Sequence, residues 1–299
     1  MYLSKHYIDF NNDPLSQVLH EESKQFLETT ELPNRKVETW KYTNISNELE
    51  KSFALARPKN QDFDKVSGFT NLFFSNGKLI ENKSDNDDFS CAMVTDAKEL
   101  ESIVTQMDKD FKKDYATSLQ LLLHDKVYKI KVPKNTSLSK PILIHHSITD
   151  ESSFAQSFLI IEMEEGSKAQ VCETYEEESK NQQFFSMTII NSKANSNLEH
   201  VLLQTNPEAE LVLNNVHINC EKDSYCSQSN LQLGMKKSRS YISADLVGSQ
   251  AELHLNGLNK LIDEQHADTY IKVNHKAAHS YSHQLYKSLL DDKSKSIFT

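Results

Sequence analysis

The segment Ala251-Glu-Leu-His-Leu-Asn-Gly257 decides the fold class, because apolar and polar residues alternate along it. Leu253 and Leu255 would point to the same side of an extended chain, as in a half-buried strand. The segment Tyr270-Ile-Lys-Val-Asn274 has the same alternation, with its isoleucine and valine on one face. Both segments therefore predict β-strands in the second half of the chain.

Similar apolar or alternating runs recur from about residue 127 onward. They begin near Ile142, Phe158, Ala169, Phe184, Leu198, Leu211, Ser227, Tyr241, Glu252, Thr269 and His283. These starts are about 14 residues apart, and no helical stretch long enough for a βαβ crossover separates them. Taken two at a time they recur every ~25 to 31 residues, the length of a β-solenoid coil with two strands and two corners. A large antiparallel sandwich is the alternative, and the spacing alone does not decide between the two.

Asparagine is the residue that we expect to turn the corners between these strands. The chain has only six glycines, and asparagine enters the left-handed backbone region more readily than most other residues. The candidates are Asn191, Asn195, Asn197, Asn214, Asn215 and Asn256. Their abundance favours the solenoid without excluding the sandwich.

The first part of the chain carries signals for helices. Asp13-Pro14 is a typical helix start, and the apolar residues after it keep the helical period to about residue 29. A second helix is predicted to begin at Thr95-Asp96, and a third to extend from Phe111 through Leu122. Asn76-Gly77 between apolar residues predicts a hairpin, and the polar run 81–88 predicts a loop. We therefore expect a helical and mixed N-terminal region over residues 1–125 and a β-rich core over residues 126–299.

The composition excludes several functional classes. The 299 residues include 33 basic and 43 acidic side chains, and the resulting net charge of −10 argues against partners such as nucleic acid or an anionic membrane surface. The N-terminus lacks the apolar core of a secretory signal, and no apolar run approaches the ~18 residues of a membrane span. The sequence therefore predicts a cytoplasmic protein. Its four cysteines are too sparse for a disulfide framework or a paired zinc site, so we expect reduced, packed thiols.

His275, His279 and His283 form the sharpest metal-like pattern in the chain. On a helix, neighbouring members would lie about 5–6 Å apart, but four residues of strand span ~13 Å, which is too far to share one ion. Because the flanking residues alternate, we expect a strand or strand corner and no single-metal site. At His145-His146, successive strand residues face opposite ways, so we expect one buried and one exposed imidazole.

The remaining reactive side chains form no recognisable catalytic motif. Cys220 and Cys226 are expected to flank a turn, and the acidic runs 162–165 and 176–178 are expected to be solvated strand ends. The chain contains no phosphate-binding loop, dinucleotide fingerprint, G-x-S-x-G or H-E-x-x-H motif. Phosphoryl transfer, nicotinamide chemistry, α/β-hydrolase chemistry and zinc-protease chemistry therefore lose their usual sequence support.

Two groups of residues resemble a known family. Glu38-Thr-Trp-Lys-Tyr-Thr43 resembles the E-x-W-K-Y-T signature of the SufB/SufD family of iron–sulfur cluster assembly subunits, and favours the SufD branch over SufB. A second group, between residues 234 and 298, is similar to the core pattern of the same family. The positions carried over are Trp40, Lys41, Tyr42, Thr43, Arg239, His266, Asp268, His275, Ser282, Tyr286 and Lys287. We expect them to be structural, because polar ladders stabilise stacked coils.

The resemblance implies the fold that the spacing left open, a right-handed parallel β-helix (β-solenoid) between an N-terminal helical region and a C-terminal helical domain. It also implies a non-catalytic scaffold subunit of the SUF system. Such a subunit pairs with a SufB-like paralogue and a SufC-like ATPase in a SufBCD complex. This chain would then bind no cofactor stably, and an iron–sulfur cluster would be present only transiently in the complex, on ligands such as Cys and His.

The resemblance ends with the chain. Family members continue past the position of Ile297-Phe298 with further coils and with the helical domain that docks the ATPase. The histidine of the family's H-G-A-T motif would lie in that part. We therefore expect a fragment or a truncated gene product, and we carry over no catalytic, cofactor-binding or metal-binding residue.

Two other functions are compatible with a β-helix. One is an enzyme acting on acidic polysaccharide, for which Lys236, Lys237 and Arg239 are the only compact basic cluster. The other is a stand-alone metal-binding module built on the late histidines. The first needs a basic groove, and the second needs imidazoles that converge.

Overall fold

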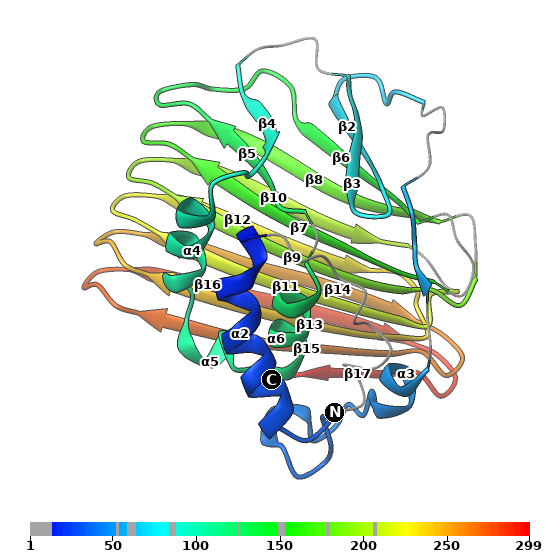
Figure 1. Ribbon diagram of the computed structural model, residues 1–299. Coiled ribbons are helices and arrows are strands. Elements are labelled where there is room, and N and C mark those ends of the chain that lie inside the picture. The colour runs from blue at the N-terminus through cyan, green and yellow to red at the C-terminus, as the bar shows by residue number, and fades with distance from the viewer. Residues whose placement is uncertain are drawn as a thin grey trace.

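The computed structural model describes residues 14–51, 54–58, 64–83, 88–124, 126–148, 153–177, 180–205 and 208–299. Within them, a helical N-terminal part is followed by strands that alternate between two sheets (Figure 1). None of the helices in these ranges is long and apolar enough to cross a membrane.

Consecutive strands of the second half belong alternately to sheet A and sheet B. Sheet A contains β1 (Ala54–Leu55), β4 (Ser90–Met93), β5 (Tyr128–Val132), β7 (Ser153–Met163), β9 (Gln183–Ser192), β11 (Leu211–Cys220), β13 (Lys237–Leu246), β15 (His266–His275) and β17 (Lys295–Phe298). Sheet B contains β2 (Thr70–Ser75), β3 (Lys78–Lys83), β6 (Ile142–Ile148), β8 (Lys168–Glu177), β10 (Asn197–Gln204), β12 (Tyr225–Gln232), β14 (Glu252–Leu261) and β16 (Tyr281–Leu290). From β5 onward each strand pairs with the next strand but one along the chain.

The pairing between successive coils, from β5 onward, is parallel, which settles the architecture. Phe154 pairs with Gln183, 29 residues later, and Gln183 pairs with Leu211, 28 residues later. A parallel neighbour one full coil away is the defining feature of a β-solenoid, whereas a sandwich of the expected kind would be antiparallel. The β-solenoid is therefore confirmed, and the sandwich alternative is wrong. The antiparallel pairs are β2 with β3, at the predicted Asn76-Gly77 hairpin, and β4 with β5.

Apolar side chains from both sheets fill the interior of the solenoid. One continuous buried cluster includes Leu159, Ile161, Ile190, Ile218, Leu253 and Leu255. Strands β10 and β12 of sheet B alternate between buried and half-exposed residues, as expected for a sheet with one wet face. Strands β7, β9 and β11 of sheet A are buried almost continuously, so their outer face must also be covered.

The N-terminal helices provide that cover (Figure 1). They are α2 (Pro14–Thr29), η1 (Glu38–Trp40), α3 (Ser46–Glu50), α4 (Ala97–Thr105), α5 (Lys109–Lys112) and α6 (Tyr115–Leu123). Helix α6 lies against β9 and β11, and its Leu119 packs in one cluster with Phe185 and Leu213 of those strands. Phe111 of α5 packs similarly with Tyr241 of β13. The helical part is thus attached to the solenoid by a second apolar layer.

The helix predictions are correct except at one point. Helix α2 has the predicted bounds, and α4 begins after Asp96, whose side chain accepts a hydrogen bond from the Lys98 amide. The single third helix from residue 111 to 122 is wrong, because Asp114 starts a new helix there. Its carboxylate accepts hydrogen bonds from the amides of Ala116 and Thr117, so α5 ends and α6 begins. The predicted loop 81–88 is also wrong in part, because residues 81–83 belong to β3, while residues 84–87 lie outside the described residues.

Left-handed residues line one corner of the coil, between sheet A and sheet B. They are Gly166, Asn195, Asp223, Gln250 and His279, with φ between 56° and 69°. The amide of each of the first three donates to a carbonyl in the next coil, at Ala194, Lys222 and Ser249, over 3.0 Å in each case. Of the six asparagines expected at corners, only Asn195 turns one. Asn214 and Asn215 are buried in the middle of β11, so that expectation is largely wrong.

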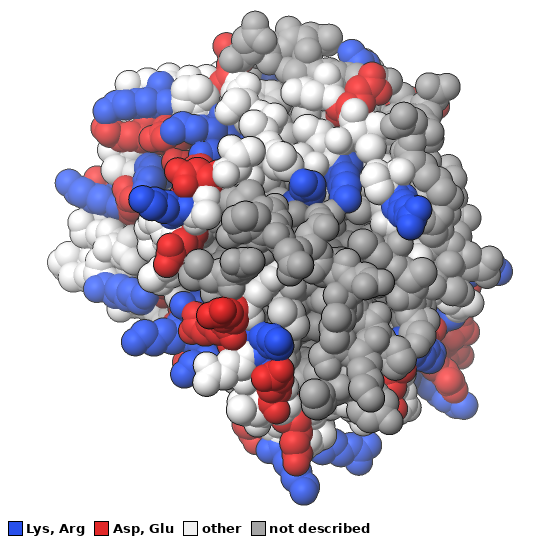
Figure 2. All heavy atoms as spheres, in the orientation of Figure 1, with Lys and Arg blue, Asp and Glu red and all other residues white. Residues whose placement is uncertain are grey.

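Acidic and basic side chains are intermixed on the face that carries the helices (Figure 2). Several form ion pairs between neighbouring coils, such as Lys134 with Glu165 at 2.6 Å and Lys193 with Glu221 at 3.0 Å. The described part of this face therefore has no broad field of one sign, although the net charge is −10.

Candidate functional site

Arg239 is the most deeply buried charged side chain that the sequence singled out. It lies in β13 with 1% of its surface exposed, and its Nη1 donates to the carboxylate of Asp268, its register partner on β15. Its Nη2 donates to the backbone carbonyl of Thr39 over 2.6 Å. The guanidinium lies 3.9 Å from the centre of the Trp40 ring, in a cation–π arrangement. A buried guanidinium needs such partners, because desolvation otherwise makes it costly.

Thr43 links the same carboxylate to the helical part. Its hydroxyl donates to Asp268, and its oxygen lies 2.9 Å from Nε2 of His266. Because the hydroxyl proton points to the carboxylate, the oxygen accepts from a protonated Nε2, which sets the tautomer of the ring. Burial lowers the pKa of His266, against the opposing effect of Asp268, so the ring is neutral at pH 7.

Trp40 extends this group of contacts to helix α6. Its Nε1 donates to Asp114 over 2.8 Å, and Asp114 is the residue that caps the helix. Burial raises the pKa of Asp114, and the charge of Arg239 opposes that rise. We call Trp40, Thr43, Arg239, His266 and Asp268 the junction, because they join the N-terminal motif to strands β13 and β15.

The other singled-out positions lie outside the junction. Lys41 and Tyr42 of the same motif are exposed, and the Lys41 ammonium lies 5.4 Å from the centre of the Tyr42 ring. At the far end, His275 is held by the hydroxyls of Ser280 and Ser282, at 2.8 Å from Nδ1 and 3.0 Å from Nε2. Tyr286 packs over Gly257, where an added Cβ would lie 2.1 Å from its ring, and Lys287 is exposed.

The three late histidines lie in different elements. His275 ends β15, His279 turns the corner with φ of 59°, and His283 lies within β16. The expected strand and corner placement is confirmed. The three imidazoles therefore do not share one face of a helix, which is the arrangement that would have placed neighbouring members about 5–6 Å apart.

A second buried group lies inside the solenoid, and no sequence motif predicted it. Glu173 of β8 is fully buried, and its two oxygens accept from Nε2 of His146 and Nε2 of His200, each over 2.9 Å. The hydroxyl of Thr188 donates to the same carboxylate over 3.1 Å. Although burial opposes ionisation, these hydrogen bonds and the two imidazoles hold the pKa of Glu173 far below its ordinary value. We call these four residues the interior cluster.

The interior cluster overturns the expectation for His145-His146. Both imidazoles are buried, with 3% and 1% of their surface exposed. His146 faces inward to Glu173, while His145 on the other face stacks on Phe73 of the neighbouring strand β2 with ring centres 4.5 Å apart. Its Nε2 also lies 3.0 Å from Oδ1 of Asn71. The strand parity was right, but the outer face of β6 is covered and not wet.

Comparison with known proteins identifies the fold's family. Residues 146–299, just over half of the chain, match the family described as SUF system FeS cluster assembly, SufBD core domain. The chain belongs to this family. The matched part runs from the end of β6 through β17, so it contains the whole interior cluster and the solenoid side of the junction.

One curated relative of this SufB/SufD family member is the iron-sulfur cluster assembly protein SufD of Escherichia coli (strain K12). The two are 26% identical over 286 residues, which is 92% of this chain and 66% of that protein. The chain thus spans just under two thirds of the length of its relative. The similarity extends into the N-terminal part, where the W-K-Y-T motif lies.

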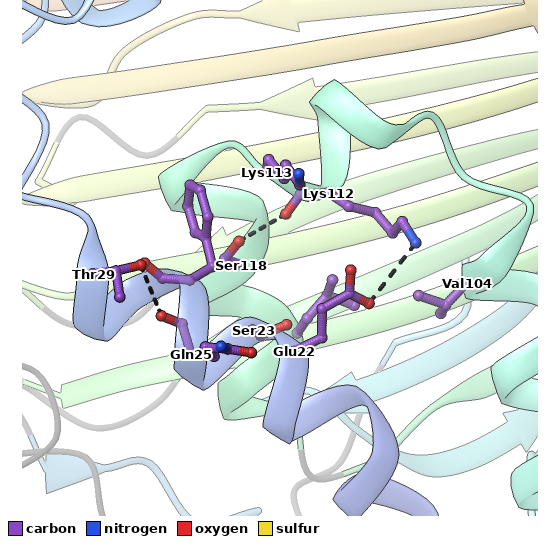
Figure 3. Close-up of a pocket in the computed structure, with 10 residues that line it drawn as sticks. Glu22, Ser23, Gln25, Thr29, Val104, Lys112, Lys113 and Ser118 are labelled. Carbon is purple, nitrogen blue, oxygen red and sulfur yellow. Dashed lines mark hydrogen bonds and ion pairs between the residues drawn. The ribbon is translucent and has the colours of Figure 1, made fainter.

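Two surface cavities of this SufB/SufD family member are lined mainly by its helical part. One of about 300 Å³ lies between α2 and the segment from α4 to α6 (Figure 3), and Glu22 and Lys112 approach to 4.0 Å across it. A second, also of about 300 Å³, lies beside the junction and is lined by Trp40, Asp114 and Tyr270 among others. The residues that line these two cavities include no histidine and no cysteine. Neither cavity therefore offers a nucleophile with a neighbouring imidazole base.

The four cysteines of this SufB/SufD family member are free. Cys220 ends β11 and Cys226 lies in β12, on either side of the corner at Asp223, as the sequence predicted. Burial raises the pKa of Cys91 to about 12 and also raises that of Cys172. A hydrogen bond with Cys220, together with burial, raises the pKa of Cys226 well above its ordinary value. These three thiols are therefore protonated at neutral pH, and an iron ion would have to displace their protons in order to bind.

Proposed function

We propose that this chain is a non-catalytic scaffold subunit of cytoplasmic SUF iron–sulfur cluster assembly, pairing with a SufB-like paralogue and a SufC-like ATPase. The observation that carries the proposal is the parallel solenoid with a filled interior, to which the junction fixes the N-terminal motif. Stacked coils of this kind make a stiff surface for partner proteins. Membership of the SufB/SufD family indicates the process in which the chain takes part, iron–sulfur cluster assembly.

The position of the polar groups supports a scaffold over an enzyme. The interior cluster is fully buried, and the junction is buried beneath the helical part except for the half-exposed His266, so neither group presents a catalytic set of side chains to a dissolved substrate. We propose that both groups are structural. On this view the family positions in the junction keep the helical part and the solenoid in one fixed arrangement.

We further propose that a cluster is held only transiently, by this chain together with its partners. The protonated thiols of Cys91, Cys172 and Cys226 support this view. Anaerobic incubation of the chain alone with ferrous iron and sulfide should then give no stable cluster absorption. The same incubation with the SufB-like and SufC-like proteins should give it.

The partner assignment is tested by co-expression with tagged SufB-like and SufC-like proteins from the same genome. We expect this chain to co-purify with the SufB-like protein, and the Lys41→Ala variant to behave in the same way because Lys41 is exposed and outside the junction. Arg239→Met should reduce the yield of complex, because it loosens the N-terminal part. A folded chain that never co-purifies with either protein would overturn the assignment.

Among the residues that the structure describes, the basic cluster expected for a polysaccharide enzyme does not form a groove. Of its basic cluster, Arg239 is buried in the junction, and Lys237 pairs with Glu48 at 2.7 Å. Lys236 donates to the side chain of Asn181 over 2.9 Å and lies 3.6 Å from Glu210. These three side chains are therefore committed to internal contacts and do not line a basic groove.

A further inference from the structure

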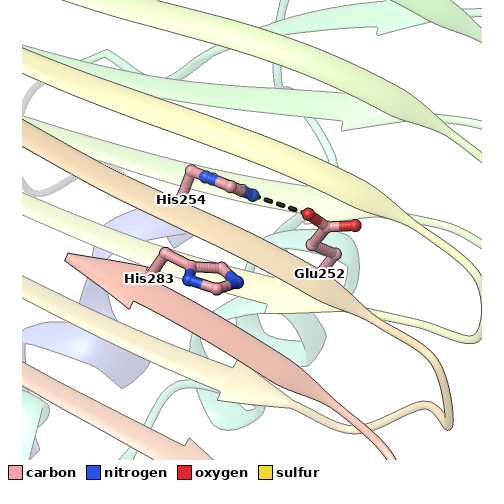
Figure 4. A group of neighbouring side chains, drawn as sticks. All are labelled: Glu252, His254 and His283. Carbon is pink, nitrogen blue, oxygen red and sulfur yellow. Dashed lines mark hydrogen bonds and ion pairs between the residues drawn. The ribbon is translucent and has the colours of Figure 1, made fainter.

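Glu252, His254 and His283 come together on the outer face of sheet B. His254 of β14 and His283 of β16 are register partners on neighbouring parallel strands, so their side chains leave the sheet in the same direction. Glu252 precedes His254 by two residues and therefore lies on the same face. Figure 4 shows the three side chains directed toward one another from these two strands.

The geometry of the three side chains is already close to that of a chelate. One ligand atom from each residue lies within 4.8 Å of the other two. Nε2 of His254 donates to Oε1 of Glu252 over 2.6 Å, and the two imidazoles stack with centres 4.8 Å apart at 26°. Nitrogen and oxygen ligands lie about 2.0–2.2 Å from a metal such as zinc. Rotation about the side-chain bonds closes the remaining gap, while the paired backbones stay fixed.

The surroundings leave the three side chains accessible. The side chains of His254 and Glu252 are 31% and 44% exposed, and His283 is exposed. The ring of Tyr225, from strand β12, lies 5.4 Å from that of His254 and covers its other side. An ion could thus enter from solvent and keep open positions for water or a small ligand.

The donor set indicates which ion fits. Two imidazoles and one carboxylate with open positions are the ligands of non-haem iron(II) sites, and imidazole also suits zinc, copper and nickel. We propose that Glu252, His254 and His283 bind one divalent first-row transition metal, with iron(II) as the physiological ion. The binding rests on this geometry alone, and only the choice of iron(II) rests on the proposed function.

The test uses the untagged chain titrated with cobalt(II), whose visible absorption reports the ligands, and with iron(II) under anaerobic conditions. We expect one ion per chain, and a loss of affinity of at least about tenfold in each of His254→Ala, His283→Gln and Glu252→Gln. His275→Gln is the matched control. His275 is also an exposed histidine in the C-terminal coils, but it is hydrogen-bonded to two serines and is not one of the three proposed ligands. The control should bind cobalt(II) like the unchanged chain.

The outcomes separate the site from its alternatives. Saturable binding that is lost in His283→Gln and kept in His275→Gln supports the site. Absence of saturable binding, or equal affinity in the unchanged chain and in His254→Ala, overturns it. Far-UV circular dichroism confirms that the exposed substitutions leave the fold intact. No partner subunit is needed, so failure here is distinct from failure of the co-purification experiment.

Discussion

Arg239 and Asp268 form a buried ion pair between neighbouring coils, 29 positions apart in sequence and directly paired in register. The side chains are 1% and 4% exposed. Because the same carboxylate also accepts from Thr43, this pair is the point where the N-terminal motif meets the solenoid. Loss of either charge therefore affects the coil stack and the helical part together.

The first prediction concerns this pair. Arg239→Met should lower the free energy of unfolding by about 3–5 kcal/mol, because it leaves the Asp268 carboxylate buried without its cation. Urea unfolding followed by circular dichroism measures the change. Lys41→Met is the control and should stay within about 0.5 kcal/mol of the unchanged chain, since Lys41 is exposed. An Arg239→Met protein as stable as the control would contradict the role of the junction.

The second prediction concerns pH and Glu173. Its pKa in the folded chain lies below the unfolded value of about 4.3. The ionised carboxylate therefore stabilises the fold fully above that value, and the contribution is lost progressively as the pH falls below it. At pH 7, Glu173→Gln should lower the free energy of unfolding by about 3 kcal/mol, because the two imidazoles lose their charged hydrogen-bond acceptor.

The pH profile provides the check on Glu173. The difference in urea midpoint between the unchanged chain and Glu173→Gln should be largest near pH 7 and should shrink between about pH 4 and pH 2. Glu199→Gln is a control on the neighbouring strand. Glu199 is exposed and accepts a hydrogen bond from Gln170 over 2.8 Å, so its substitution should not reproduce this pH dependence. A difference that stays constant with pH would show that Glu173 is not ionised in the fold.

Sequence reasoning placed the starts of several strands closely in both sheets. Strands β8, β10, β11 and β14 begin within one residue of their expected starts, and the coil length of 26 to 31 residues lies within the expected range. It was less accurate for β7, which begins at Ser153, five residues before the expected Phe158. This strand is buried almost continuously, and a strand buried on both faces has no alternation to detect. Strand β5 was not found, although its buried and half-buried residues alternate.

The candidate site depended on register, which composition does not reveal. Trp40, Thr43, Arg239, His266 and Asp268 were named from the family resemblance, but their mutual contacts join segments about 200 residues apart. The interior cluster was missed because His146, Glu173 and His200 are each separated by 27 residues. Once the coil length is known, a glutamate flanked in register by Ile144 and Leu202 is conspicuous as a polar residue in an apolar column.

The corners were also missed, for a related reason. The left-handed position is occupied in turn by Gly166, Asn195, Asp223, Gln250 and His279. What repeats is the backbone conformation and not the residue type. The residue that follows is more uniform, since it is serine after all of them except Gln250, where it is alanine.

The third prediction uses this column of corners. Gln250 has φ of 59°, which a residue with a Cβ adopts at a cost of about 1–2 kcal/mol. Gln250→Gly should therefore raise the free energy of unfolding by about 0.5–1 kcal/mol, after the greater flexibility of glycine in the unfolded chain is allowed for. Gln170→Gly, within strand β8, should lower it by a similar amount. We expect the urea midpoint to rise in Gln250→Gly and to fall in Gln170→Gly. A lower midpoint in Gln250→Gly would contradict the proposed backbone strain at this corner.

The fourth prediction concerns Gly248, two residues before that corner. An added Cβ would lie 1.9 Å from the backbone nitrogen of Lys222 in the preceding coil, and a backbone atom cannot rotate away. Gly248→Ala should therefore lower the free energy of unfolding by about 1–3 kcal/mol. Ser249→Ala, at the next residue, should change it by less than about 0.5 kcal/mol. Equal stability of the two variants would show that neighbouring coils do not approach as closely as described.

The last prediction concerns the thiols and bears on how a cluster is held. Iodoacetamide reacts with thiolates, and the pKa of Cys91 is raised to about 12, so native Cys91 should be alkylated at pH 7.5 at least about tenfold more slowly than free cysteine. Cys220 and Cys226 are buried and should be labelled only after unfolding in urea, which also serves as the control for reactivity. Mass spectrometry of peptides measures each rate. Rapid labelling of native Cys91 would reveal a reactive thiolate and would contradict this prediction.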